Sequence, residues 1–486
     1  MERGPEAEIF KEEIYIDRRP LPLLLFLAYK RGLVLILAFL LSGIILQLPA
    51  PVGLSLAGQR CLAIFSLCLI CWITNALPLA ITSLMAMGLL ALLRVLESKE
   101  VFALFGNEAV FFILGAFILA AALMKTGLSS RIALWLLNRF STSPARLLLG
   151  ILLSAAFLSC WMPEHAVAAF LFPVVLEITQ ALGLKIGKSP YGTALFLALA
   201  WGSIIGGVQT FLGGARNVLA IGILREFSGQ QIGFLEWIIA VWPIVLWDLT
   251  IAYLILLRAF PPEISDIRGA VRVLQEKQLA RGKITGEEKR ALFILLLTIT
   301  AWVFLGHRIG LATIAIISAV ALFLLNIVSW HDVEDYVNWG VILMYGGAIA
   351  LGVALARTGA GHWAVTSFIT QWQPSPASII AVLVIISICL TEAMSNSAVV
   401  AMILPLGLSL SSYYHIDPKV VVYAVAVPAG LAVTLPMGTP PMAICYASGY
   451  LKIRDLLIYG LLLIINSIIF FILMTHTYWK LIGIRF

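Results

Sequence analysis

The sequence has little charge for its length. Only 12% of its 486 residues are Asp, Glu, Lys or Arg, whereas 61% are hydrophobic and the mean hydropathy is +1.02. Soluble globular domains carry about 25% charged residues. The composition therefore excludes a water-soluble globule and predicts a protein that lies in a lipid bilayer.

Cysteines are also few, and their positions exclude two kinds of small stabilising site. None of the six has a partner at a paired spacing on a polar loop: Cys61, Cys68, Cys71, Cys160, Cys389 and Cys445. A disulfide framework or a zinc site needs such spacing, so we expect packing residues instead. We also expect no removable signal peptide, because the first apolar run follows a charged segment, residues 1–31, without a cleavage signature.

What the sequence has in abundance is long apolar runs. Crossing the hydrocarbon core takes roughly 20 apolar residues, and runs near that length recur throughout the chain: 33–48, 61–93, 109–124, 237–257, 291–305, 339–356 and 455–474. We predict about eleven spans and two re-entrant hairpins. The predicted fold class is an all-α polytopic membrane protein, multi-pass in the cell membrane.

The basic residues predict the orientation of the chain. They concentrate over residues 258–290 and over the stretch 131–146 that follows the fourth predicted span. Cationic loops remain cytoplasmic, and Arg18, Arg19, Lys30 and Arg31 place the N-terminus on the same side. This placement accounts for the net charge of +7 without a nucleic-acid partner.

One pattern occurs twice, 232 positions apart. Residues 162–167 (MPEHAV) correspond to 394–399 (MSNSAV), and the offset also relates 125–127 to 357–359. By our count of spans, an odd number of crossings separates the copies, which predicts that the second is inverted. Duplicated membrane halves with polar breaks at matching depths are typical of a transport site at the repeat interface.

The repeat defines a predicted domain organisation. Residues 1–59 form an N-terminal cytoplasmic segment with the first span, and residues 60–258 form the first inverted-repeat unit. Residues 259–289 form a cytoplasmic linker able to hold a short surface helix, and residues 290–486 form the second inverted-repeat unit. Each unit is expected to hold a re-entrant hairpin, with tips near 159–167 and 391–399. Each also holds a helix broken by Gly or Pro, near 202–217 and 436–442. Such breaks expose backbone groups that only a cavity or an ion tolerates.

Two motifs of the second half resemble those of a transporter family. Residues 391–397 (TEAMSNS) look like the Ser-Asn-Thr signature of the divalent anion/sodium symporters, and 437–441 (MGTPP) resembles their Thr-Pro-Pro motif. Residues 72–79 and 346–359 match as well, and the resemblance covers about 55–475. It implies an elevator transporter, usually a homodimer and without a cofactor, that moves sulfate-like or di- and tricarboxylate anions together with sodium.

The resemblance also implies roles for individual residues. A sodium site would be lined by Thr391, Ser395, Asn396 and Gly438, and the anion would touch Ser395, Asn396, Ser397, Thr439 and Pro440. Ser159 is the counterpart of Thr391 and a candidate for a residual first cation site. Hydroxyl, amide and carbonyl oxygens suit a hard monovalent cation, and N–H groups at a helix start suit an anion. The alternative is that Ser395 and Asn396 only cap helices.

The first half departs from the family pattern. Pro163-Glu164-His165 stand where the family has Ser-Asn-Thr, and residues 214–217 (GARN) replace Thr-Pro-Pro-Asn. Ionisable side chains at mid-membrane are costly and mark functional sites. Our hypothesis is that Glu164 and Arg216 pair, with Arg216 in the place of the first sodium, and we count His165, Arg216 and Asn217 as anion ligands and Glu164 as a coupling residue.

Several alternatives remain open at this level. Glu164, His165 and Arg216 could form a fixed, neutralised network that carries nothing, or Glu164 and His165 could serve a proton-coupled or exchanging anion carrier. A membrane enzyme is disfavoured, because no second cluster of ligating residues and no nucleophile motif accompanies them. The leading prediction is sodium-coupled symport of sulfate or a dicarboxylate, since a guanidinium binds either.

Two further acids inside apolar stretches have open roles. Glu392 stands beside the second tip and is either a cation or proton partner or a local cap. Asp248 lies within the 237–257 run, where we favour a structural contact between helices.

Overall fold

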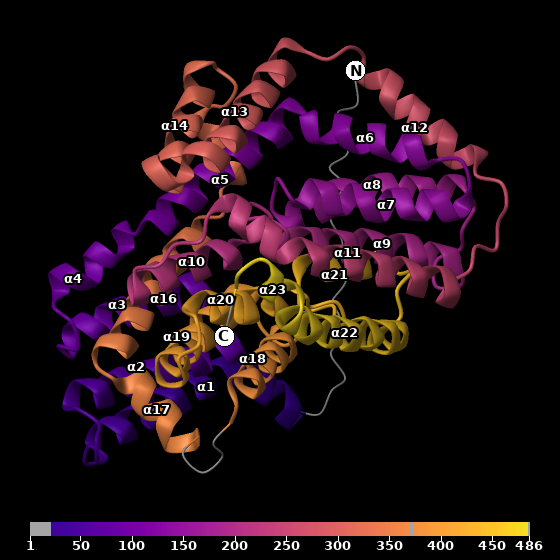
Figure 1. Ribbon diagram of the computed structural model, residues 1–486. Helices are drawn as coiled ribbons and strands as arrows, with labels where there is room; N and C mark the ends of the chain where they lie inside the picture. Colours follow the sequence, from indigo (N-terminus) through magenta and orange to yellow (C-terminus); the bar gives the residue numbers. More distant parts are fainter. Residues whose placement is uncertain (1–20, 370–373, 485–486) are drawn as a thin grey trace, which may run out of the picture.

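The computed structural model describes residues 21–369 and 374–484, and every regular element in these ranges is a helix (Figure 1). The predicted all-α polytopic membrane fold is confirmed. Within the two ranges, nine helical segments are long and apolar enough to cross a membrane. The apolar helices α3 (Leu79–Leu92) and α14 (Leu311–Leu324) are shorter, with 14 residues each. The predicted cytoplasmic N-terminus, with Arg18 and Arg19, lies outside the described residues.

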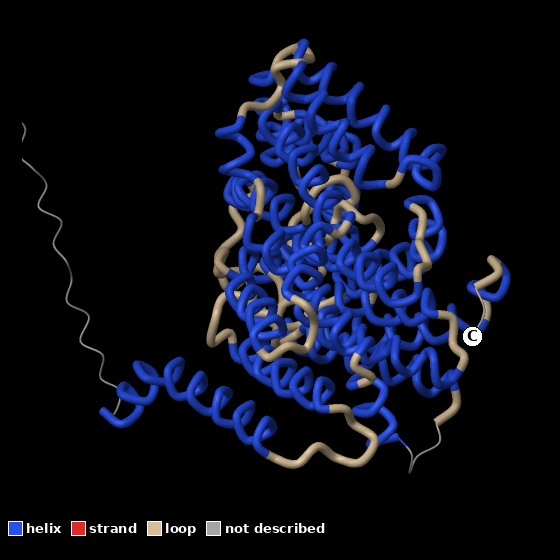
Figure 2. The backbone as a smooth tube through the Cα atoms, turned by 90° about the vertical axis from the view of Figure 1, so that its left-hand side faces the viewer, coloured by secondary structure: helices blue, strands red, loops and turns tan. Residues whose placement is uncertain are grey.

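The helices fall into two groups that each pack mainly within themselves. In the first group α3 packs against α16, and α14 packs against α5. Its members are α1 (Leu21–Gln47), α2 (Leu56–Thr74), α3, α4 (Ser98–Ala103), η1 (Leu104–Gly106), α5 (Glu108–Thr126), α13 (Gly286–Ile309), α14, α15 (Trp330–Tyr336) and α16 (Trp339–Arg357). In Figure 2, α1 is the helix that stands apart at the edge and leads into the long grey trace.

The second group holds both hairpins and both broken helices. In it α7 and α8 pack on α9, and α11 packs on α22. Its members are α7 (Pro144–Ser159), α8 (Glu164–Ala181), α9 (Pro190–Val208), α10 (Ala215–Ser228), α11 (Phe234–Ala259), α18 (Pro376–Thr391), α19 (Asn396–Tyr414), α20 (Pro418–Ala426), η2 (Pro428–Gly430), α21 (Pro440–Tyr446), α22 (Ile453–His476) and α23 (Tyr478–Leu481). Helices α6 (Leu128–Phe140) and α17 (Ala360–Ile369) connect the groups, as Figure 1 shows.

The internal repeat is visible in the helix boundaries. Helices α7 and α18 begin and end 232 residues apart, as do α3 and α14, and α8 and α19 begin at the same offset. The left-handed backbone positions that end helices or turn the chain recur in the same register: Arg94 with Asn326, Gly127 with Gly359, and Gly183 with His415. Positive φ is uncommon for residues other than glycine, so matching positions mark the same local structure in both halves.

The first arm of each hairpin is short. Helices α7 and α18 have 16 residues each, which gives a length of about 24 Å, less than the roughly 30 Å of a hydrocarbon core. Each arm starts with a proline behind a serine that caps the helix: Ser143 accepts a hydrogen bond from the Arg146 N–H, and Ser375 from the Ser378 N–H. The tips comprise residues 160–163 and 392–395.

Three predicted boundaries were wrong. The run 61–93 is two helices, because Asn75 takes a left-handed conformation (φ 51°) and Pro78 precedes α3. The first break comprises only residues 209–214, since α9 continues through Gly202 to Val208. The second break comprises residues 431–439, and residues 440–442 already belong to α21.

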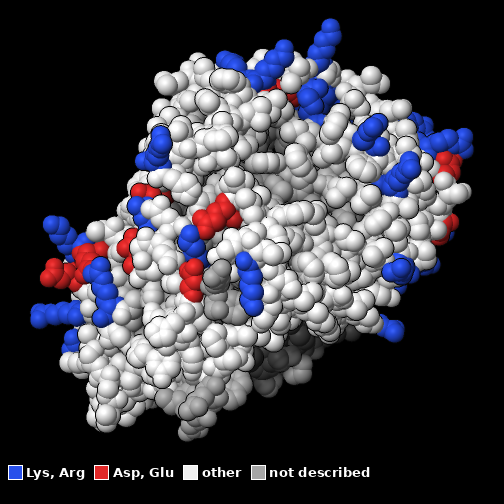
Figure 3. Space-filling model, viewed as in Figure 1, with Lys and Arg blue, Asp and Glu red and all other residues white. Residues whose placement is uncertain are grey.

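Helix α12 (Arg268–Arg281) lies in the linker and packs against both α6 and α8. Arg281 donates to the Gly127 carbonyl at 2.7 Å, and Lys277 pairs with Glu177 of α8 at 2.8 Å. Figure 3 shows Lys and Arg along the upper and right-hand margin, where Figure 1 places α12, while large parts of the visible face carry no charge.

An ion pair anchors the end of α5. Lys125 meets Asp332 of α15 at 2.6 Å. Although burial opposes ionisation, hydrogen bonds from Lys125 and Ser329 lower the pKa of Asp332 to about 2. Because the folded pKa lies below the ordinary value, this contact stabilises the fold above pH 4 or so and is lost as the pH falls through about 2.

Helix α9 is the centre of the second group, and it is buried along its whole span. It approaches α7 closely through Gly202 and Gly206. A Cβ added at Gly206 would lie 2.2 Å from the Ala156 carbonyl oxygen, which is backbone and cannot easily move. The close packing of the hairpin on α9 therefore depends on the missing side chain.

Replacing Gly206 with alanine is expected to destabilise the protein by about 1–3 kcal/mol, because the added methyl group overpacks this contact. Thermal unfolding of the purified protein in detergent measures the effect. The matched control is Gly88→Ala in α3, where nothing lies within 4 Å of the added Cβ. Equal melting temperatures for the two variants would contradict the packing argument.

Candidate functional site

The two hairpin tips meet at the centre of the second group. Asn396 donates its amide Nδ2 to Glu164 Oε1 at 3.4 Å, and these two residues are repeat counterparts, 232 positions apart. Trp201 Nε1 likewise donates to the Val433 carbonyl, its own counterpart, at 3.1 Å. A residue that touches its own counterpart lies at the pseudo-two-fold axis between the repeats, so this axis passes between the tips and beside the helix breaks.

The hypothesised ion pair is present at this place. Arg216 Nη1 lies 3.2 Å from Glu164 Oε2, and the side chains are only 2% and 8% exposed. Arg216 stands in the first turn of α10, directly after the first break, and the Glu164 N–H donates to the Gly213 carbonyl of that break at 3.1 Å. The hairpin tip and the break are thus joined by both backbone and side chain.

Three glycines make room for the pair. An added Cβ would lie 2.5 Å from Glu164 Oε2 at Gly207, 2.6 Å from Arg216 Nη1 at Gly214, and 2.4 Å from both Arg216 Nε and Nη2 at Gly430. No real Cβ tolerates such distances, so the guanidinium and carboxylate occupy space that side chains leave free. Gly207 and Gly430 were not predicted as site residues. The available signal in the sequence was the Gly206-Gly207 pair and the run Pro428-Ala429-Gly430 beside the breaks.

One edge of the Arg216 guanidinium is free. Its Nε and Nη2 are buried and have no hydrogen-bond partner among the described residues. Buried donors are almost always satisfied, and this edge is the fork that binds a carboxylate or sulfate with two parallel hydrogen bonds. These two donors lie beside Gly430 and have no acceptor among the described residues.

Oxygens gather on the other side of the axis. Thr391 Oγ1 lies 2.7 Å from Asn396 Oδ1 and 2.8 Å from the Ala429 carbonyl oxygen. The one hydroxyl proton cannot serve both acceptors at once, so the set is rich in lone pairs and suits a small hard cation. The interpretation that Ser395 and Asn396 only cap helices is wrong for the tip, because Ser395 makes no side-chain capping bond and Asn396 contacts Glu164 and Thr391.

Glu392 has a local role. Its carboxylate accepts hydrogen bonds from the N–H groups of Val433, Thr434 and Leu435 at 3.0, 2.9 and 2.8 Å. It thereby satisfies the backbone of the second break, as the capping alternative held. Asp248 is a helix contact as predicted: its Oδ1 lies 2.7 Å from Ser467 Oγ of α22.

The other candidate residues differ in their exposure and in their hydrogen-bond partners. Ser159 is fully buried with an unpartnered hydroxyl in the described structure, and Thr439 donates to the Ala432 carbonyl at 3.3 Å. Gly438 and Ser397 are buried, whereas His165 and Ser395 are half-buried and Pro440 is exposed. Asn217 differs from our prediction, because its Nδ2 donates to the Gly207, Val208 and Thr210 carbonyls and braces the first break instead of facing an anion.

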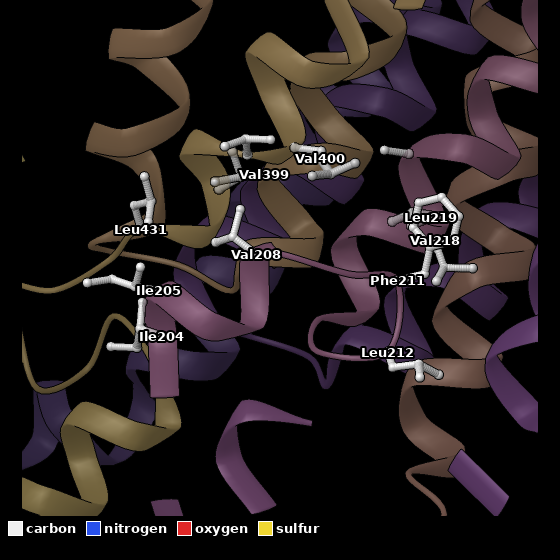
Figure 4. Packing of buried hydrophobic residues seen from close by; sticks show 14 of the residues in the cluster. Ile204, Ile205, Val208, Phe211, Leu212, Val218, Leu219, Val399, Val400 and Leu431 are labelled. Carbon is white, nitrogen blue, oxygen red and sulfur yellow. The ribbon is translucent and has the colours of Figure 1, made fainter. Parts of the chain in front are cut away.

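Buried apolar side chains lie on the elements that carry the candidate site. Figure 4 shows them arriving from α9, the first break, α10, α19 and the second break, and all are buried: Ile204, Ile205, Val208, Phe211, Leu212, Val218, Leu219, Val399, Val400 and Leu431. Tyr345, on α16 of the first helix group, donates its hydroxyl to the Ala215 carbonyl next to Arg216. No sequence signal marked Tyr345. The dry surroundings strengthen every charge interaction at the centre.

A membrane protein with two repeated halves, each giving a hairpin and a broken helix to one buried polar centre, has the architecture of a secondary transporter. The model of the sodium:sulfate symporter transmembrane region matches residues 29–485, and the chain belongs to that family. It is therefore a transporter of the symporter type and not an enzyme.

Comparisons with individual proteins agree. The chain is 32% identical to a sodium-dependent dicarboxylate transporter, SdcS, of Staphylococcus saprophyticus, over 91% of this chain and 90% of the relative. It is 30% identical to SdcS of Staphylococcus aureus over the same shares.

Two solved structures share the fold at low identity. MtrF of Neisseria gonorrhoeae has a TM-score of 0.55 at 12% identity and covers 94% of this chain and 95% of its own. The YdaH transporter of Alcanivorax borkumensis has a TM-score of 0.55 at 14% identity, with 95% and 99% covered.

Gly430→Ala is expected to lower anion uptake by about 10–100-fold, because the methyl group displaces the guanidinium fork and small displacements in a binding site are costly. Uptake of labelled anion into proteoliposomes measures it. Gly43→Ala in α1, where the added Cβ meets nothing within 4 Å, serves as the control. Wild-type uptake by Gly430→Ala would show that the position of Arg216 does not matter.

Proposed function

We propose that this protein is a sodium-coupled symporter of small divalent anions, with dicarboxylates as the first candidates. The observation that carries the proposal is the buried Arg216 fork at the meeting point of both hairpins, beside the oxygen cluster of Thr391, Asn396 and Ala429. An anion and a cation can bind there within a few ångströms of each other, which coupled transport requires.

The anion is proposed to lie between the fork and the start of α19. Arg216 Nε and Nη2 would hold one carboxylate, and the N–H groups at the N-terminus of the 19-residue helix α19, with Ser395 and Ser397, would hold the other. Thr439 and Pro440 border the same space at the start of α21. Sulfate fits the fork as well, but the relatives named as dicarboxylate transporters favour the longer anion.

Sodium is proposed to bind in the second half only. Thr391 Oγ1, Asn396 Oδ1 and the Ala429 carbonyl would be its ligands, with Ser395 and Gly438 beside them. In the first half Arg216 supplies a fixed positive charge in place of a sodium ion. The expected consequence is a stoichiometry that is lower by one sodium than that of a relative with both sites.

The proposed mechanism is of the elevator type. The helix group that holds the site would move against the group of α3, α5, α14 and α16, with α6 and α17 as the connecting arms. We further propose a homodimer with a cytoplasmic N-terminus, on the family resemblance and on the distribution of basic residues.

The alternative is a proton-coupled or exchanging carrier. His165 follows Glu164 at the tip, is half-buried, and makes no hydrogen bond within the described residues. Histidine is the side chain whose charge most often changes near neutral pH, which makes His165 the candidate for a proton-coupled alternative.

The proposal is tested in proteoliposomes with an inward sodium gradient and labelled succinate, citrate and sulfate. Wild type should accumulate succinate from the sodium gradient alone. In Arg216→Asn the rate of uptake should fall strongly, because the anion loses the guanidinium. The uptake that remains should depend on sodium more steeply by about one ion, because an asparagine can again be a sodium ligand. Loss of uptake at every sodium concentration would instead assign Arg216 to the anion alone.

A second variant tests whether any loss of uptake comes from misfolding caused by an unpaired buried charge. Glu164→Asn/Arg216→Asn removes both charges together, so that no unpaired charge remains buried. Arg272→Asn, at an exposed position of α12, is the control and should behave as wild type.

His165→Gln tests the proton alternative. If sodium alone drives uptake, the dependence of the initial rate on pH between about 5 and 8, where imidazoles titrate, should be the same in the variant and in wild type. A pH profile that flattens in His165→Gln would favour proton coupling through this residue.

A further inference from the structure

The Glu164 carboxylate is shared between the two proposed binding sites. Its Oε2 faces Arg216 Nη1 at 3.2 Å, and its Oε1 faces Asn396 Nδ2 at 3.4 Å. Asn396 presents its Oδ1 to Thr391 at 2.7 Å, and Thr391 reaches the Ala429 carbonyl at 2.8 Å. A continuous line of contacts therefore leads from the guanidinium that faces the anion to the oxygens that face the cation.

Both contacts of Glu164 are long for charge-assisted bonds, which are usually 2.7–2.9 Å. The carboxylate is thus held between its partners and is not fixed to either. The space around it is free of side chains at Gly207, where a Cβ would lie 2.5 Å from Oε2. The carboxylate thus lies against the backbone of Gly207, between Arg216 and Asn396.

The charge of Glu164 opposes anion binding. It neutralises Arg216, and an anion on the free edge of the guanidinium would lie close to a second negative charge in dry surroundings. Other ionisable groups do not relieve this: His165, next in α8, has no contact with Glu164 that the described structure shows, and Glu392 is held by three N–H groups of the second break. Anion binding therefore needs an added positive charge near Glu164.

We infer that Glu164 couples the two sites. A sodium ion bound by Asn396 and Thr391 attracts the carboxylate and offsets its negative charge, and it thereby lowers the repulsion that the anion meets at Arg216. Without sodium, Glu164 occupies Arg216 as an internal competitor. This inference rests on the proposed function and adds the residue through which the cation raises the affinity for the anion.

Coupling of this kind is reciprocal, because each ligand changes the affinity for the other by the same factor. In wild type, sodium should lower the Kd for succinate by about 10-fold or more, within the usual range for coupled sites. In Glu164→Gln the neutral amide no longer competes, so the Kd for succinate should be the same with and without sodium. The sodium affinity of this variant should fall, because the carboxylate near the cation is gone.

The experiment uses the full chain, purified in detergent, and measures binding of labelled succinate in sodium chloride and in choline chloride. Proteoliposomes give a second readout: Glu164→Gln should exchange succinate across the membrane without sodium but should not accumulate it from a sodium gradient. A merely structural role of Glu164 would lower binding under both conditions and would leave the ratio unchanged.

Matched variants distinguish a loss of coupling between the sodium and anion sites from a general loss of folding or binding. Glu177→Gln removes a carboxylate from the same helix, at the surface pair with Lys277, and should keep the wild-type ratio. Glu164→Asp keeps the charge and should keep part of the sodium effect. Glu164→Gln/Arg216→Gln should melt as a folded protein but bind no succinate in either salt.

The inference is overturned if Glu164→Gln retains the wild-type dependence of succinate affinity on sodium. It is also overturned if acidification in the absence of sodium raises the wild-type affinity as much as sodium does, since a proton would then be the neutralising cation. If succinate binding and uptake by wild type do not depend on sodium at all, the proposed function itself is contradicted. This measurement needs only the wild-type protein, so it distinguishes the failure of the proposed function from the failure of the inference.

Discussion

A buried ion pair on the axis between the repeats sets the conditions for the rest of this structure. Charges taken out of water are costly unless each finds a partner, and Glu164 and Arg216 find each other only when the first hairpin and the first helix break are in contact. Asn396 adds the second hairpin to the same carboxylate. The pair therefore ties together elements that lie far apart along the chain, and it does so where helix ends are already open for ligands.

The centre is made possible by side chains that are absent. Gly202 and Gly206 allow the first hairpin to approach α9, and Gly207 and Gly430 leave the space that the carboxylate and guanidinium fill. Buried apolar residues lie on the same elements, and Figure 4 shows Val208, Val399 and other members of this cluster. Packing and electrostatics therefore depend on the same short segments, because glycines that allow close helix packing stand beside glycines that leave space for the charged side chains.

Much of this could be predicted from the sequence, because composition and the 232-residue offset are strong signals. They gave the membrane class, both hairpins and the pairing of Glu164 with Arg216. Exact helix ends could not be predicted: Gly202 looked like a helix breaker but is a packing contact, and only the approach of α7 explains it. Asn217 looked like a ligand, yet backbone carbonyls of the break hold its amide. The role of Tyr345 could not be predicted, because a single aromatic residue in an apolar helix is not distinctive. Its contact with the Ala215 carbonyl becomes clear only when α16 and α10 are placed together.

The contact between Glu164 and Asn396 has a consequence for the history of the chain. These residues occupy the same position in the two copies, and they face each other across the axis. Two identical copies assembled from one short gene would place the same side chain on both sides, either two acids that repel or two amides that carry no charge. An acid opposite an amide requires two copies that differ in sequence, and this chain has both copies in one polypeptide. One polypeptide that holds both copies can therefore carry a charged residue in one half and a neutral residue at the matching position of the other.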